Sequence, residues 1–283
     1  MTNSLAAITG ASSGIGSVFA RKLAAQGYDL LLIARRRDRL DQLAAELERA
    51  HQIHVEACTA DLSVVEEMDR VAARLAAEPR LDLLVNNAGA AWRARFADGG
   101  YENVRRTMAI NFDAQVRLTE ALLPLLRASA PSAIVNVAST AGRVARAGSG
   151  AYSASKFALA GWSDALWAEE HAHGVHVGLV LPGFISTEGF PQSELTAKPW
   201  TRWIVSTPDK AAEAIHEAGI GRRPERYVPR AYALAGVLRI LAPGLVRRAL
   251  AGGGAAVMTT TTGADMAERR NGSGAGAGPA SSS

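Results

Sequence analysis

The sequence predicts a doubly wound α/β fold with a parallel sheet, for three reasons. Short apolar runs alternate along the chain with longer stretches of helical periodicity, which is the order of strand–helix–strand units. The apolar runs are nearly continuous, as expected for strands that are buried on both faces of a sheet. Hydrophobic residues make up 48% of the 283 residues and charged residues 20%, so the chain has the composition of a soluble protein with a large core.

Strands and helices are expected to alternate up to Leu181. The strands are expected at Leu5–Thr9, Asp29–Ala34, His54–Thr59, Leu81–Asn86, Ala133–Ala138 and His176–Leu181. The helices are expected at Ile15–Gln26, Arg37–His51, Ser63–Ala77, Tyr101–Arg127 and Tyr152–His173. Because crossovers between parallel strands are right-handed, the loops that follow the strands gather at one edge of the sheet, where such folds bind ligands.

The C-terminal part of the chain differs in composition from the rest. Residues 1–220 contain all the predicted strands and are expected to form one three-layer α/β/α domain. Residues 221–251 are predicted as a basic amphipathic extension, in which Pro243 would kink or divide a helix. Residues 252–283 are rich in Gly, Ala, Ser and Thr and are predicted to be a disordered tail.

The basic charge of the chain is concentrated at its C-terminal end. The net charge is +4, and residues 221–283 carry nine Arg against three acidic residues. Because the basic charge has this origin, it does not indicate a nucleic-acid partner. The sequence begins with no signal-peptide pattern and contains no apolar stretch long enough to span a bilayer, so the protein is expected in the cytoplasm.

The sequence Thr9–Gly16 joins the first strand to the first helix. Gly10 permits a tight turn, Gly14 lets a pyrophosphate approach the backbone, and Gly16 permits close packing of the helix. The loop also contributes Ser12, Ser13 and Ile15. Its position predicts a Rossmann-like dinucleotide site, with phosphate at the helix N-terminus. A nucleophile elbow with Ser12 as the nucleophile is disfavoured, because no earlier strand supplies its oxyanion loop.

The end of the second strand favours NADP(H) as the cofactor. An NAD site usually places an acidic residue here, but the chain has Ala34 followed by Arg35. A guanidinium pairs with a 2′-phosphate through charge-assisted hydrogen bonds. Asp61, with Leu62 beside it, is expected to bind the adenine, or alternatively to act as a cap or turn residue. Arg36 is interpreted as part of a solvated helix start.

Further residues of the predicted site follow the later strands. They are Asn87, Ala88 and Gly89 after the fourth strand, Ser139 after the fifth, Tyr152 and Lys156 in the next helix, and Pro182, Gly183 and Thr187 after the sixth. With the glycine loop, their order and spacing resemble the short-chain dehydrogenase/reductase family over about residues 4–220. The resemblance implies an oxidoreductase that transfers a hydride between a nicotinamide cofactor and its substrate.

Tyr152 and Lys156 lie four residues apart and so share one face of a helix. A free Tyr has a pKa near 10, and the nearby ammonium is expected to lower it. The resemblance implies that Tyr152 is the acid and base and that Lys156 binds the nicotinamide ribose. It further implies that Ser139 holds the substrate oxygen and that Asn111 positions a water that relays protons to Lys156.

These features together predict an NADP(H)-dependent enzyme that interconverts a ketone or related carbonyl compound and a secondary alcohol. Aromatic residues after the fourth strand and within 183–207, the segment expected to cover the substrate, favour an apolar substrate, unless they only pack that segment. The alternatives are an NAD-dependent alcohol dehydrogenase and a non-catalytic dinucleotide-binding sensor or scaffold. The resemblance also implies a homodimer or homotetramer.

The sequence contains two further surface features, an apolar helix face and a group of histidines. Leu234, Val237, Leu238 and Leu241 form an apolar helix face, which is expected to pack against a partner subunit or the substrate-covering segment. Contact of residues 229–250 with an anionic membrane is the less favoured alternative. The histidines near Gly174 are interpreted as solvated residues at a helix end, and no metal is expected.

Overall fold

A seven-stranded parallel sheet forms the centre of the computed structural model, which describes residues 3–187 and 204–251. The strands lie in the order β3-β2-β1-β4-β5-β6-β9. Their bounds are β1 Leu5–Thr9, β2 Asp29–Ala34, β3 Val55–Thr59, β4 Leu83–Asn86, β5 Ser132–Val137, β6 Val175–Pro182 and β9 Glu225–Val228. The order reverses beside β1, so the predicted doubly wound parallel sheet is confirmed.

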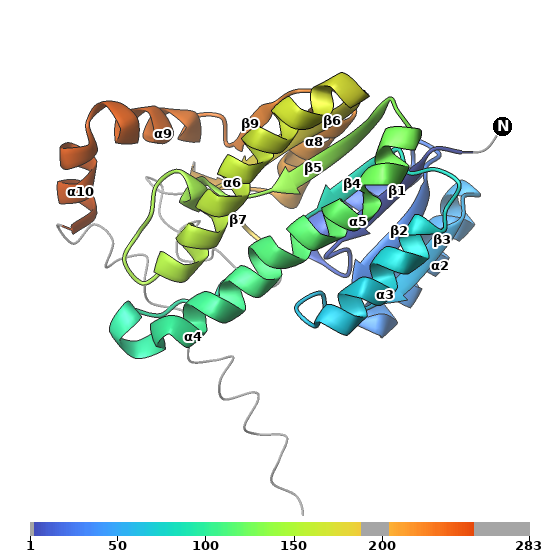
Figure 1. Ribbon diagram of the computed structural model, residues 1–283, viewed down its shortest axis with the longest axis horizontal. Helices are drawn as coiled ribbons and strands as arrows, with labels where there is room; N and C mark the ends of the chain where they lie inside the picture. The colour runs from blue at the N-terminus through green and yellow to red at the C-terminus, as the bar shows by residue number, and fades with distance from the viewer. Residues whose placement is uncertain (1–2, 188–203, 252–283) are drawn as a thin grey trace, which may run out of the picture.

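Helices cover both faces of this sheet and give it three layers (Figure 1). One face carries α1 Gly14–Ala24, α2 Arg37–His51 and α8 Pro208–Gly219. The other carries α3 Val65–Ala76, α5 Ala114–Ala128 and α6 Gly150–Glu170, with α4 Phe96–Met108 leading into α5. A small sheet pairs β7 Phe184–Ile185 with β8 Val205–Ser206.

The core explains why the strands read as continuous apolar runs. Successive side chains of a strand point to opposite faces of the sheet. Ile8 and Leu32 pack under α1 and α2, whereas their neighbours Ala7 and Leu31 pack under α3 and α5. All four are buried, so both alternating sets of each strand have to be apolar.

The predicted helix at 101–127 is interrupted in the structure. A π-helical turn, Ala109–Asp113, separates α4 from α5 without a change in direction of the chain. The sequence pattern does not reveal this turn, because the buried residue within it, Asn111, is polar like the buried Thr107 before it and the buried Gln115 after it. Turns of this kind often occur at functional sites, and this one contains Asn111.

The seventh strand lies beyond residue 220, within the range predicted as an extension. β9 pairs in parallel with β6, with Leu179 opposite Glu225 and Pro182 opposite Val228. The sequence does not reveal β9 because half of its four residues are charged, as is common for a strand at the edge of a sheet. The sheet therefore continues past the predicted boundary of the main domain.

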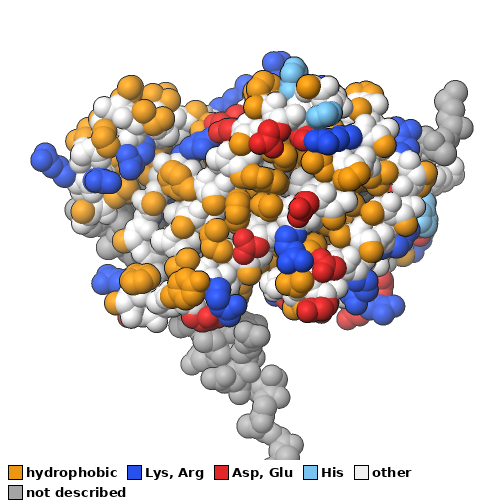
Figure 2. Space-filling model, viewed as in Figure 1, with side chains coloured by type: hydrophobic (Ala, Val, Ile, Leu, Met, Phe, Trp, Pro, Cys, Tyr) orange, Lys and Arg blue, Asp and Glu red, His pale blue; other side chains and the backbone are white. Residues whose placement is uncertain are grey.

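Two helices project from one end of the molecule (Figure 1). Pro243 begins α10 Pro243–Ala251 and separates it from α9 Tyr232–Leu241, as predicted. The predicted apolar face is exposed in the single chain, at Leu234, Val237, Leu238 and Leu241. On the side in view, Figure 2 shows apolar and basic side chains on these helices. No helix within residues 3–187 and 204–251 has the length and apolarity needed to span a membrane.

Candidate active site

The glycine loop Thr9–Gly16 turns from β1 into α1 in a crowded setting. Gly10 has φ of +71°, and a Cβ on it would lie 2.8 Å from the Asn87 side-chain nitrogen. A Cβ on Gly16 would lie 2.5 Å from the carbonyl oxygen of Gly10. Neither position has room for a side chain, because the contact partners are packed loop atoms.

Asn87 and Thr9 hold the glycine loop against the end of β4. The Asn87 Nδ2 donates to the Thr9 carbonyl at 2.9 Å, and the backbone N–H groups of Asn87 and Ala88 donate to the Thr9 hydroxyl at 2.9 Å. Gly14, with φ of +57°, faces Thr187, whose methyl group would lie 3.4 Å from a Cβ on Gly14. The loops after β1, β4 and β6 thus meet around one turn.

The two arginines after β2 contact different partners at the rim of this loop. Arg35 Nη1 lies 3.7 Å from Asp61 Oδ2. Arg36 Nη2 donates to the hydroxyls of Ser13 and Ser12, at 2.5 Å and 3.2 Å. Arg36 is exposed at the start of α2, as interpreted, and its guanidinium also joins both serines of the glycine loop.

Asp61 forms the turn after β3. Its Oδ1 accepts hydrogen bonds from the backbone N–H and the hydroxyl of Ser63, at 3.0 and 2.6 Å. Burial acts to raise the pKa of this carboxyl, but the hydrogen bonds from Ser63 and the charge of Arg35 hold the pKa below its ordinary value. Leu62, which the sequence adds to the cofactor site, has its side chain buried in the core, so only its backbone is left for a ligand.

Ser139, Tyr152 and Lys156 line one cavity of about 200 Å³ at the same edge of the sheet, together with Ile15 and Gly183. The Ser139 hydroxyl lies at the end of β5, where it donates to the carbonyl of Pro182 at 3.2 Å and accepts from the backbone of Ala141 at 3.1 Å. It is also hydrogen-bonded to the phenol of Tyr152, which lies in the first turn of α6.

Lys156 is buried beside the Tyr152 ring. Its Nζ lies 6.0 Å from the ring centroid and donates to the carbonyl of Val137 at 2.8 Å. Burial lowers the pKa of Lys156 to about 7, because the ammonium is removed from water. The lysine therefore titrates in the physiological range.

The direction of the Tyr152 pKa differs from the one that the sequence predicts. Burial raises this pKa, and the hydrogen bond with Ser139 and the charges of Arg146 and Arg93 only partly offset the rise. The sequence shows the neighbouring Lys156 but not the burial of both groups. The structure thus holds the phenol in its protonated form at neutral pH.

Asn111 is fully buried in the π-helical turn between α4 and α5. Its Oδ1 accepts from the backbone N–H of Ala90 at 2.8 Å, and its Nδ2 donates to the Ala90 carbonyl at 2.9 Å and to the Ser155 hydroxyl at 3.0 Å. A Cβ on Gly89 would lie 2.9 Å from Asn111 Oδ1 and 3.6 Å from Lys156 Nζ. Asn111 therefore joins the loop after β4 to α6, next to the lysine.

Two arginines to which the sequence assigns no role line the reactive cavity. Arg93 lies in the loop after β4, and Arg146 lies between β5 and α6. The Arg146 guanidinium carbon lies 4.8 Å from the centroid of the Phe184 ring. No local motif contains either arginine. Their place in loops that follow parallel strands could have indicated that they lie near the ligand-binding edge of the sheet.

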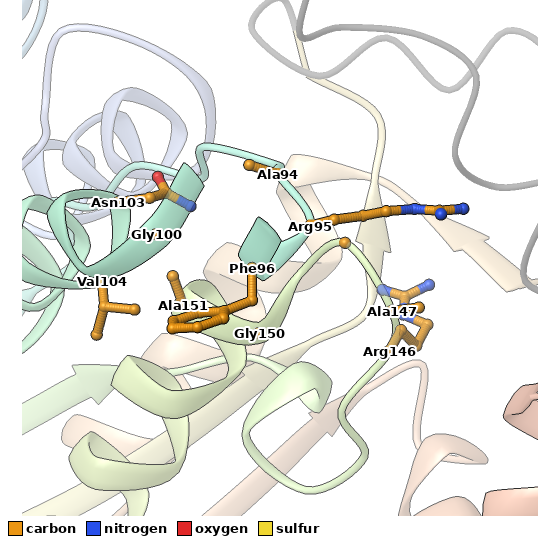
Figure 3. Close-up of a pocket in the computed structure, with 11 residues that line it drawn as sticks. Ala94, Arg95, Phe96, Gly100, Asn103, Val104, Arg146, Ala147, Gly150 and Ala151 are labelled. Atoms are coloured by element: carbon orange, nitrogen blue, oxygen red, sulfur yellow. The ribbon is translucent and has the colours of Figure 1, made fainter. Parts of the chain in front are cut away.

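The aromatic residues expected around the substrate take different places. Phe184 lines the reactive cavity, and Phe96 lines a neighbouring cavity of about 490 Å³ (Figure 3). The ring of Trp92 is covered by Arg106, whose guanidinium carbon lies 4.8 Å from the ring centroid. Outside the described residues lie Phe190, Trp200 and Trp203.

The C-terminal helices reach the site through Tyr232, the first residue of α9. A Cβ on Gly183 would collide with the Tyr232 ring, and the Tyr232 hydroxyl donates to the Ile204 carbonyl at 3.1 Å. Burial raises the pKa of Tyr232 to about 12. Tyr232 therefore ties α9 to the end of β6 and to the segment before α8.

Comparison with known proteins agrees with this geometry. The sequence profile of the short chain dehydrogenase family matches residues 4–197. The chain belongs to the short-chain dehydrogenase/reductase family. It is 30% identical over 264 residues to the bovine dehydrogenase/reductase SDR family member 7B, covering 88% of this chain and 81% of that one. The family assignment makes the protein an oxidoreductase that uses a nicotinamide dinucleotide.

Solved structures of other short-chain dehydrogenases have the same fold. A short-chain dehydrogenase from Sphingobium yanoikuyae in complex with NADPH is 32% identical, with a TM-score of 0.73 over 85% of this chain and 96% of that one. A bulky-bulky ketone specific alcohol dehydrogenase from Comamonas testosteroni is 26% identical, with a TM-score of 0.72 over 86% of this chain and 95% of that one.

Proposed function

We propose that this short-chain dehydrogenase/reductase interconverts a ketone or related carbonyl compound and a secondary alcohol, with NADP(H) as the cofactor and Tyr152 as the acid and base. The observation that carries the proposal is the meeting of Ser139, Tyr152 and Lys156 in one cavity beside the glycine loop. A binding protein without catalysis has no need of a buried lysine beside a partly buried tyrosine.

The residues around the glycine loop fit a dinucleotide. The absence of side chains at Gly10, Gly14 and Gly16 lets a pyrophosphate approach the backbone at the N-terminus of α1. Thr187 lies across the loop from Gly14. The remaining residues proposed to hold the cofactor are Ser12, Ser13, Ile15, Arg35, Asp61, Leu62, Asn87, Ala88, Gly89, Tyr152, Lys156, Pro182 and Gly183.

NADP(H) is proposed because two arginines follow β2 beside the glycine loop. Arg35 follows Ala34 at the end of β2, and the Arg36 side chain reaches the serines of the glycine loop. Guanidinium groups bind phosphate in a planar, charge-assisted geometry. The solved Sphingobium relative, which contains NADPH, supports the same choice.

We propose that side chains of the protein bind the substrate, donate the proton and bind the cofactor. A bound nicotinamide supplies the hydride. The Ser139 hydroxyl is placed to hold the substrate oxygen beside Tyr152. The Tyr152 phenol is protonated at neutral pH, so it is ready to give its proton to the oxygen as the carbonyl is reduced. Lys156, with a pKa near 7, is placed to bind the cofactor ribose and to take part in returning the proton.

The cofactor assignment is tested by titrating the protein with NADPH and NADH, following nicotinamide fluorescence. Wild type is expected to bind NADPH at least about 10-fold more tightly, and Arg35→Ala and Arg36→Ala are expected to remove most of this preference. Equal affinities in all three proteins would discard the NADP(H) assignment, and a preference for NADH would favour an NAD-dependent alcohol dehydrogenase.

The reaction is tested by following NADPH oxidation with a panel of ketones and aldehydes. Turnover of at least one carbonyl compound is expected. Tight NADPH binding without turnover of any compound would favour a sensor or scaffold.

We propose a homodimer or homotetramer as the assembly. Two observations support it. On α6 the apolar side chains of Phe157 and Trp167 are exposed, and on α9 the apolar face is exposed in the single chain. Light scattering is expected to give at least twice the monomer mass, with a lower mass for Trp167→Glu. A monomer that binds anionic vesicles would instead favour membrane contact through α9 and α10.

A further inference from the structure

We propose that the substrate is a carbonyl compound with one short and one long apolar substituent, and that the long substituent binds in the cavity of about 490 Å³ beside the reactive cavity. This inference rests on the proposed function and extends it to the substrate class. It goes beyond the expectation of an apolar substrate, because it assigns the two substituents of the carbonyl carbon to two different cavities.

The first argument is the size of the reactive cavity. Its volume is about 200 Å³, and its walls include Ile15 and Thr187, which are proposed to hold the cofactor. Cavities that enclose a whole small molecule usually have volumes of about 300–1,000 Å³. Beside a bound nicotinamide, the reactive cavity therefore has room for the carbonyl group and a short substituent, and a longer substituent has to lie outside it.

The second argument is the position of the larger cavity, which lies between the first turns of α4 and α6. Arg146 lines both cavities. On α6, Ala151 lines the larger cavity and the next residue, Tyr152, lines the reactive one. In the loop after β4, Ala94 and Arg93 are divided in the same way. A chain attached to a carbonyl group at Tyr152 is therefore within short reach of the larger cavity.

The third argument is the apolar character of the walls. Figure 3 shows Arg95 and Arg146 toward one end of the larger cavity, with Phe96, Val104 and Ala151 toward the other. The side chain of Phe96 is 77% exposed in the single chain. An apolar chain that extends from Arg146 past Phe96 would remove part of this ring from water, which favours binding.

The polar wall residue on α4, Asn103, has both ends of its amide paired within the protein. Its Nδ2 donates to the carbonyl of Trp92 at 3.3 Å, and its Oδ1 accepts from the Arg106 guanidinium at 2.9 Å. Because these hydrogen bonds are internal, an apolar chain can lie against Asn103 without leaving its amide unpaired. The α4 side of the cavity therefore suits an apolar ligand.

The experiment compares two isomeric ketones that have the same composition and differ in the position of the carbonyl group. Heptyl methyl ketone has one long and one short substituent, whereas dibutyl ketone has two of equal length. Both are titrated calorimetrically into the protein–NADP⁺ complex, so no turnover is needed. Wild type is expected to bind heptyl methyl ketone at least about 10-fold more tightly, because only this isomer matches one small and one large cavity.

Two variants fill the larger cavity from different elements, Gly150→Leu from α6 and Ala147→Leu from the loop before it. A Cβ on Gly150 would meet no atom within 4 Å, so the leucine has space without a clash. Both variants are expected to lose about 10-fold or more in affinity for heptyl methyl ketone and less for dibutyl ketone. Gly244→Leu is the matched control. Gly244 also lies in the first turn of a helix, with no atom within 4 Å of a Cβ, but it lines neither cavity, so this variant should bind as wild type does.

Equal affinities of wild type for the two ketones, or no binding of heptyl methyl ketone, would overturn the proposal. An unchanged preference in both filling variants would overturn it as well, and a lower assembly mass of these variants in light scattering would then assign the cavity to a contact between subunits. Loss of the preference in the filling variants, without reduction of any carbonyl compound by wild type, would leave the cavity assignment standing and reject the proposed function instead.

Discussion

The two sides of Tyr152 are built in different ways. The cofactor side consists of strand ends and a glycine loop, and its contacts are mostly backbone to side chain, as between Thr9 and Asn87. The substrate side consists of long side chains from separate loops, among them Arg93, Arg146 and Phe184. The first side needs room for a ligand to approach the backbone, and we expect the second to select the substrate through its side chains.

This difference predicts which amino-acid substitutions each side can tolerate. Adding a methyl group to the glycine loop at Gly10 or Gly16 should disturb the packing of the protein itself, because the neighbouring atoms are backbone and the hydrogen-bonded side chain of Asn87. Changing a side chain on the substrate side should alter which compound is reduced but leave the fold intact. The predictions below test this separation, beginning with the largest expected effect.

Ser139→Ala should reduce kcat about 100-fold, because the substrate oxygen loses a hydrogen bond next to Tyr152. The affinity for NADPH should change less than about 3-fold, because the hydroxyl bonds to Pro182 and Ala141 and to no part of the glycine loop. Steady-state kinetics measure kcat, and fluorescence titration of the same preparation measures the NADPH affinity. A large loss of NADPH affinity would show that the two sides are not separable.

Gly16→Ala should destabilise the protein by about 1–3 kcal/mol, because the new Cβ would lie 2.5 Å from the Gly10 carbonyl oxygen. Gly161→Ala in α6 is the matched control, since a Cβ there has no neighbour within 4 Å, and it should stabilise the helix by about 0.5–1 kcal/mol. Urea denaturation measures the free energy of unfolding of both variants and of wild type. Equal stabilities would contradict the close approach of α1 to the loop.

The buried Lys156 should make stability depend on pH. Its pKa is about 7 in the folded protein and higher in the unfolded chain, so the unfolded state binds more protons between these values. The free energy of unfolding should therefore rise with pH from about 7.5 to 9.5, by on the order of 1 kcal/mol per pH unit relative to Lys156→Met. Parallel pH profiles of the two proteins would indicate that Lys156 keeps an ordinary pKa.

The sequence predicts the fold well where both faces of a strand are buried. The six strands from β1 to β6 fall within two residues of their expected bounds. All of them except the edge strand β3 are buried along nearly their whole length, and burial on both faces imposes apolar runs. The sequence does not predict β9, because Glu225 and Arg226 give this segment the composition of a loop. The sequence does not predict the π-helical turn at Asn111, because polar residues are buried before it, within it and after it, so no change of pattern marks it.

In the candidate site, too, some features can be predicted from the sequence and others cannot. The glycines and the Tyr152–Lys156 pair are visible in the sequence because their spacing is local. The hydrogen bonds of Arg36 are not visible in the sequence, because its partners Ser12 and Ser13 lie more than 20 residues earlier and become neighbours only when β2 pairs with β1. The contact of Arg146 with Phe184 is not visible in the sequence either, because Phe184 lies in another loop.

The central claim is that cofactor and substrate react at Tyr152, and one labelling experiment tests it most directly. Wild type and Tyr152→Phe are given NADPH deuterated at the transferred C4 position and a carbonyl compound that wild type accepts. The account predicts deuterium on the carbinol carbon of the product with wild type, a rate lower by about 100-fold or more with Tyr152→Phe, and nearly equal NADPH affinities. Unchanged turnover in Tyr152→Phe, or alcohol without the label, would contradict it.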